Sequence, residues 1–171
     1  MDDTSETRGL FITGLKNAHA MESQALSIMR PQLSRIKNYP QVAQRLEQHV
    51  AETEGQQQRL EAVLESCGES RSGLKDAALS MGGTMAALGH AAAGDEILKD
   101  AFADYAFENY EIAAYTSLIS LAEASGEQAA VAPLQQNLAE EQAMADWIKS
   151  NLDTLTTQYA GRRESGEPAK I

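Results

Sequence analysis

Two stretches of the chain decide its fold: Leu46-Glu-Gln-His-Val-Ala-Glu52 and Leu134-Gln-Gln-Asn-Leu-Ala-Glu140. They lie 88 residues apart and share four of their seven residues. A second pair of acids, Glu22 and Glu111, is separated by 89 residues, so the two halves of the chain are nearly in step. A repeat at this spacing predicts two helical hairpins that face each other.

The rest of the sequence has a helical period and no convincing alternating strand pattern. Stop signals such as Tyr39-Pro40, Gly68 and Ser125-Gly126 separate five predicted helices, at about 6–37, 40–66, 74–93, 95–124 and 127–159. One domain should span 5–160, and the polar residues 161–171 are predicted to form a disordered tail. Two hairpins joined by a long connection predict an all-α, ferritin-like, up-down-down-up four-helix bundle, with an additional helix in the crossover.

Composition and charge narrow the classes of partner. With 25 Asp and Glu against 14 Lys and Arg, the net charge of −11 disfavours nucleic acid as a direct partner. No apolar run approaches the roughly 20 residues that a membrane span needs, and the acidic N-terminus is unlike a secretory signal. The single cysteine, Cys67, cannot form an internal disulfide, so we expect a cytoplasmic protein.

Acidic residues recur on or beside the apolar faces of the predicted helices. Glu22, Glu52 and Glu111 lie there, and the repeat adds Glu140, although Glu141 also fits the stripe of its helix. Buried carboxylates without partners would lose their hydration and repel one another. A pair of divalent cations would remove both problems, as in carboxylate-bridged iron or manganese centres. The pattern predicts such a centre and does not identify a catalytic residue.

The sequence departs from the usual form of that centre, which places Glu on two helices and Glu-x-x-His on the other two. Three residues after Glu52 comes Gly55, and Ala143 occupies the same place after Glu140. Instead, His49 precedes Glu52 and Glu108 precedes Glu111, each by three residues. The two helices should run parallel, so we expect His49 and Glu108 to share a layer and complete the coordination.

Each of these residues also has an ordinary interpretation. A glutamate on a helix is usually solvated, and His49 could be a core histidine bonded to a carbonyl or an acid. Tyr115 and Gln56 are predicted to donate hydrogen bonds to the ligands, although Tyr115 fits an ordinary core position equally well. The joint placement of the four glutamates at matched depths favours the metal site.

Two strings resemble the YciE/YciF family of bacterial stress-associated proteins: His49-Val-Ala-Glu-Thr-Glu-Gly-Gln56 and Glu108-Asn-Tyr-Glu-Ile-Ala-Ala-Tyr115. The resemblance covers about residues 5–155. It implies a ferritin-like fold related to rubrerythrin and bacterioferritin, a homodimer and a two-metal centre, and it implies no established reaction. Asn109 stands where close relatives would have His, and Ala51 stands where an acid is common; neither change removes a proposed ligand.

Three functions are compatible with these features. The first is a di-iron oxidoreductase that reacts with peroxide or oxygen, a small oxidant, with Mn or Zn as other occupants of the same ligands. The second is a non-catalytic dimeric stress or interaction protein with a structural or vestigial metal site. The third, iron storage, is the weakest, because it needs a hollow cage of many subunits. Whether the protein is an enzyme stays open at this point.

Overall fold

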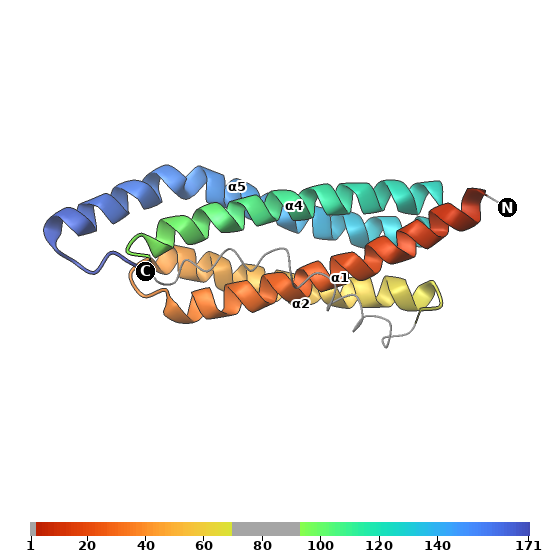
Figure 1. Ribbon diagram of the computed structural model, residues 1–171, viewed down its shortest axis with the longest axis horizontal. Coiled ribbons are helices and arrows are strands. Elements are labelled where there is room, and N and C mark those ends of the chain that lie inside the picture. The colour runs from red at the N-terminus through yellow and green to blue at the C-terminus, as the bar shows by residue number, and fades with distance from the viewer. Residues whose placement is uncertain (1–2, 70–92) are drawn as a thin grey trace.

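The computed structural model describes residues 3–69 and 93–171, and four long helices account for most of them (Figure 1). Their bounds are Asp3–Arg35 for α1, Pro40–Ser66 for α2, Glu96–Ala124 for α4 and Gln128–Ser165 for α5. No strand occurs in these two ranges, and the prediction of an all-α four-helix bundle is confirmed. The helix predicted at 74–93 falls almost entirely on residues outside the described ranges.

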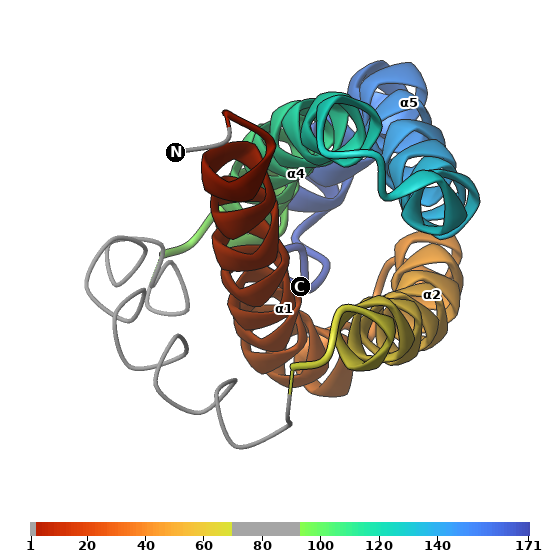
Figure 2. The ribbon, with the colours of Figure 1, turned by 90° about the vertical axis from the view of Figure 1, so that its right-hand side faces the viewer.

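The four helices form a ring in which each packs against two neighbours. Viewed end-on, the order around the ring is α1, α2, α5 and α4 (Figure 2). The α2 and α4 helices run in one direction, and α1 and α5 run in the other (Figure 1). Gly68 and Gly126, with φ of 85° and 78°, follow the ends of α2 and α4, where the left-handed backbone favours glycine.

The interior has two apolar ends and a polar middle. One end holds side chains that are at most 3% exposed, among them Phe11, Leu15, Leu60, Leu118 and Leu134. The other end is lined by residues such as Leu26, Met29, Leu46 and Ile148. Between them lie carboxylates, a histidine and amides that are also buried. None of the described helices is long and apolar enough to cross a membrane.

The C-terminal residues differ from the predicted disordered tail at 161–171. The α5 helix continues to Ser165, and the chain then folds back onto the bundle. Tyr39 donates its hydroxyl proton to the carbonyl of Ala169 at 2.6 Å, and the amide of Ile97 donates to the carbonyl of Lys170 at 3.0 Å. The Lys170 ammonium lies 3.1 Å from the carboxylate of Glu96, which is fully buried. The prediction of disorder rested on the polarity of the segment itself. It missed these contacts because the partner residues are more than 70 residues away in the sequence.

We predict that Tyr39→Phe lowers the free energy of unfolding by about 1–2 kcal/mol, because it leaves the buried carbonyl of Ala169 without a donor. Tyr110→Phe is the matched control, since the Tyr110 side chain is 56% exposed. Urea unfolding of both variants measures the difference. Equal stability of the two variants would show that the bond to the C-terminal segment contributes nothing.

Candidate metal centre

Five ionisable side chains from all four helices meet in the polar middle of the bundle. Each is at most 3% exposed. They are Glu22 from α1, His49 from α2, Glu108 and Glu111 from α4, and Glu141 from α5. Four acids and one imidazole therefore share a volume that excludes bulk water.

The histidine lies at the centre of a possible metal-ligand group. His49 Nε2 is 3.3 Å from Glu108 Oε1 and 3.4 Å from Glu141 Oε2. One ligand atom from each of these three residues can be chosen so that all lie within 4.8 Å of one another. An imidazole nitrogen with carboxylate oxygens suits Fe, Mn or Zn. These three buried residues could hold a metal ion.

The oxygen atoms around this group fit a cation. One carboxylate oxygen in each of Glu22, Glu108 and Glu111, and both in Glu141, are buried without a hydrogen-bond partner among the described residues. Buried polar atoms are rarely left in this state, because each loses its interaction with water. A cation bound between the acids would supply the missing interactions and offset their repulsion.

The pKa values of the buried groups also favour a bound cation. Burial, followed by repulsion from Glu141, raises the pKa of Glu22 well above its usual range, and burial with repulsion from Glu22 does the same for Glu111. Burial raises the pKa of Glu108 to about 8. Burial alone would lower the pKa of His49, but its contacts with Glu108, Glu141 and Glu52 raise it well above normal. Without a metal, protons must take the place of the cation.

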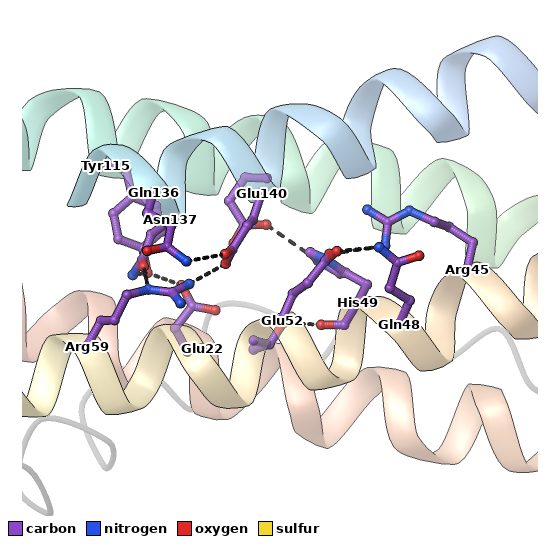
Figure 3. Close-up of polar contacts among 12 residues, drawn as sticks. Glu22, Arg45, Gln48, His49, Glu52, Arg59, Tyr115, Gln136, Asn137 and Glu140 are labelled. Carbon is purple, nitrogen blue, oxygen red and sulfur yellow. Dashed lines mark hydrogen bonds and ion pairs between the residues drawn. The ribbon is translucent and has the colours of Figure 1, made fainter. Parts of the chain in front are cut away.

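Glu52 lies outside the cluster and orients the histidine. Its Oε2 is 2.9 Å from His49 Nδ1 (Figure 3). The other ring nitrogen, Nε2, therefore faces Glu108 and Glu141. Arg45 and Gln48 donate to the same carboxylate at 3.1 and 2.7 Å. Burial opposes ionisation of Glu52, but His49 and Arg45 lower its pKa to about 2. A carboxylate behind a histidine fixes the tautomer and raises its basicity as a ligand. The structure thus places Glu52 as a support rather than among the converging oxygens.

Glu140 also points away from the centre, and Glu141 takes the inward position. Glu140 is 20% exposed on its side chain and pairs with Arg59, with Gln136 donating to it at 3.1 Å (Figure 3). Glu141 is fully buried. The preference for Glu140 over Glu141 is therefore corrected. The repeat aligned Glu140 with Glu52 correctly, but both of these positions lie on the outer side of their helices.

A series of hydrogen bonds connects Glu22 in the centre to the ion pair of Arg59 and Glu140. Tyr115 donates its hydroxyl proton to Glu22, and Asn137 donates to the Tyr115 oxygen at 3.0 Å. Arg59 donates to the side-chain oxygen of Asn137 (Figure 3). The predicted contact of Tyr115 with a candidate ligand is present. The roles of Asn137 and Arg59 were missed, although the pairing of Asn137 with His49 in the repeat was a signal for the former.

Residues other than Glu-x-x-His occupy the inward positions of α2 and α5 that are three residues apart. On α2 these buried residues are Thr53 and Gln56, and on α5 they are Glu141 and Met144. A standard centre would have Glu-x-x-His at both. Within residues 3–69 and 93–171, neither polar atom of the Gln56 amide has a hydrogen-bond partner, so its predicted contact with a ligand is not formed there. His49, one turn earlier, supplies the nitrogen that this pattern lacks.

We predict that the metal-free protein loses stability as pH rises from about 4.5 to about 8. The folded chain keeps a proton on Glu108 up to a pKa of about 8, whereas the ordinary value is 4.5, so the folded state binds more protons in this range. The raised pKa values of Glu22, Glu111 and His49 act in the same direction. Thermal unfolding of chelator-treated protein across this range measures the trend.

In the same experiment Glu111→Gln should be less dependent on pH, because a neutral amide replaces a buried acid. Glu123→Gln, at an exposed position of α4, is the control and should behave as the unmodified chain. Stability that rises with pH in the metal-free protein would contradict this account of the buried acids.

Comparisons with known proteins agree with this fold. Residues 6–161 match a family model described as a domain of unknown function, DUF892. A protein of Xanthomonas campestris pv. campestris is 29% identical, with a TM-score of 0.77, covering 93% of this chain and 99% of that one. YcfI of Rhodopseudomonas palustris is 24% identical, with a TM-score of 0.68 and coverage of 87% and 96%. The E. coli stress protein YciF is also 24% identical, with a TM-score of 0.67 and coverage of 89% and 96%.

The last two structures share the bundle fold with this chain, and the family match extends over nearly all of the described helices. The resemblance to the YciE/YciF family is thereby confirmed. The chain belongs to the DUF892 family.

Proposed function

We propose that this protein binds a carboxylate-bridged pair of metal ions, with iron as the first expectation, in the middle of its bundle. The observation that carries the proposal is the set of buried carboxylate oxygens around His49 that have no hydrogen-bond partner among the residues the structure describes. Glu22, Glu108, Glu111 and Glu141 would provide oxygen ligands and His49 one nitrogen. Manganese and zinc accept the same donors and are the alternatives.

The number of ions follows from charge. Four ionised carboxylates bring four negative charges into a volume of low dielectric, and a single divalent ion would leave half of them uncompensated. Two divalent ions neutralise the set. The protons that the raised pKa values assign to the metal-free centre would be released as the ions bind.

We further propose that the loaded protein reacts with peroxide or oxygen. When bound, ferrous iron would supply the electrons for reducing such an oxidant. The chain itself contributes a site closed to bulk water, a histidine held in one orientation by Glu52, and a tyrosine that holds Glu22. Burial and the neighbouring Glu22 raise the pKa of Tyr115 well above its usual range, so its hydroxyl keeps its proton and acts as a donor.

A non-catalytic role for the same site is the second candidate. The observation that favours it is the absence of the Glu-x-x-His pair, with Thr53, Gln56 and Met144 at the inward positions. The metal would then stabilise a bundle that acts through its surface. In either case we propose a homodimer as the working form.

We predict that protein purified without a chelating tag holds two metal ions per chain, and that Glu141→Gln weakens their binding at least tenfold. Glu140→Gln is the matched control one residue away, and it should retain the metal because Glu140 points at Arg59. Elemental analysis and a competition titration with a chelator measure both. Loss of metal in Glu140→Gln with retention in Glu141→Gln would reverse the assignment of the α5 ligand.

We predict that the ferrous form is oxidised by hydrogen peroxide with about one peroxide consumed per two iron ions. Anaerobic titration followed by absorbance measures this ratio. Glu141→Gln should react no faster than free ferrous iron, and Glu140→Gln should react like the unmodified protein. Two bound ions without reactivity toward peroxide or oxygen would eliminate the redox role and leave the structural one.

A further inference from the structure

A cavity of about 70 Å³ lies inside the bundle, beside the candidate metal centre. All four helices line it. Leu46 and Asp104, which form part of its wall, precede His49 and Glu108 by three and four residues, and Met144 follows Glu141 by three. The cavity therefore extends from the layer next to the centre toward the end of the bundle where α2 begins. Its volume is on the order of five water-sized groups.

Most of the cavity wall is apolar. Leu46, Ile97, Ala101, Trp147 and Ile148 are among the side chains that form it. Water against this apolar part of the wall lacks the two to four polar partners that hold a buried water in place. The wall suits a small molecule with an alkyl body.

The part of the wall that Gln32, Asp100 and Asp104 form offers mainly acceptors; the other polar side chains that line the cavity are Gln41, Asn151 and Thr154. Gln32 is 5% exposed and donates its Nε2 hydrogen to Asp104 Oδ1 at 3.1 Å. The oxygen of the same amide, Oε1, is a buried acceptor that no donor contacts in the part of the chain that the structure describes. The carboxylates of Asp104 and Asp100 also line the cavity, and Asp100 has a cation nearby, since Arg35 Nη2 lies 3.8 Å from its Oδ2. A ligand that matches Gln32 Oε1 and Asp104 must bring hydrogen-bond donors. Burial raises the pKa of Asp104 to about 7, and a positive charge on the ligand would favour its ionised form.

We propose that this cavity is a binding site for a small primary alkylamine. The alkyl chain would lie against Ala101, Trp147 and Ile148, and the ammonium group would donate to Gln32 Oε1 and Asp104. An alcohol of the same length would offer one donor without charge, and a carboxylic acid would place a second negative charge beside Asp104. The site goes beyond the proposed function, because its occupancy does not require a metal.

The single tryptophan of the chain provides the measurement, since Trp147 lines the cavity. Titration with n-butylamine should change its fluorescence saturably, with 1-butanol binding at least tenfold more weakly and butyrate not at all. Calorimetry under the same conditions gives an independent affinity. A response that does not saturate, or equal affinities for amine and alcohol, would overturn the proposal.

Two variants locate the amine. Ala101→Phe fills the cavity and should abolish binding, whereas Ala113→Phe, at an exposed position of the same helix, should not change it. Asp104→Asn keeps the size of the side chain and removes its charge, so it should weaken n-butylamine at least tenfold and leave 1-butanol unchanged. If Ala101→Phe does not fold, Asp104→Asn decides alone, and unchanged amine affinity in that variant would overturn the proposal.

The same titration in excess chelator separates this site from the metal centre. Amine binding should persist, because no metal takes part in it. Binding that disappears with the metal would place the amine on the ion and would overturn the cavity assignment. Failure of the metal proposal alone would leave the amine titration unaffected, so the two hypotheses can fail independently.

Discussion

The organisation of this bundle depends on the mutual repulsion of carboxylates that are held away from water. Glu22, Glu108, Glu111 and Glu141 converge from three helices, and His49 from the fourth brings the one basic group among them. Helix packing could be satisfied by leucine at all of these positions, with greater stability in the absence of a ligand. The buried acids therefore agree with the proposed site for a positively charged ligand, and the apolar ends of the bundle offset the stability that the polar middle loses.

Around this interior lies an outer set of ion pairs that fixes the inner groups. Arg45 and Gln48 hold Glu52, which orients His49, while Arg59 contacts both Glu140 and Asn137, and Asn137 positions Tyr115. The charged members of this set, Arg45, Glu52, Arg59 and Glu140, keep between 10% and 23% of their side chains exposed, so their charges remain in contact with water. The arrangement gives each inner group a defined orientation without adding further charge to the buried volume.

The helices and the depth of the acids could be predicted from periodicity, because a buried stripe at helical spacing is a local property of the sequence. Glu22, His49, Glu108 and Glu111 were placed inward on that basis, and the structure buries all four. The choice between Glu140 and Glu141 was made from the repeat, which favoured Glu140. The buried stripe of α5, which runs Leu134, Asn137, Glu141, Met144 and Ile148, has helical spacing and contains Glu141. Adjacent residues on a helix differ by about 100° in direction, so Glu140 lies off this stripe and contacts Arg59 instead. The C-terminal segment was unpredictable because its hydrogen bonds join residues distant in the sequence.

The repeat has one consequence for the chemistry of the centre. The two hairpins match in backbone and in most of their acids, but His49 on α2 corresponds to Asn137 on α5, and the latter is engaged by Arg59 and Tyr115. The proposed ligand set is thus asymmetric, because His49 is its one imidazole among the described residues and lies in one half of a nearly symmetric frame. Two ions held by it would be inequivalent, one with mixed nitrogen and oxygen donors and the other with oxygen alone, and they would differ in affinity and in redox potential.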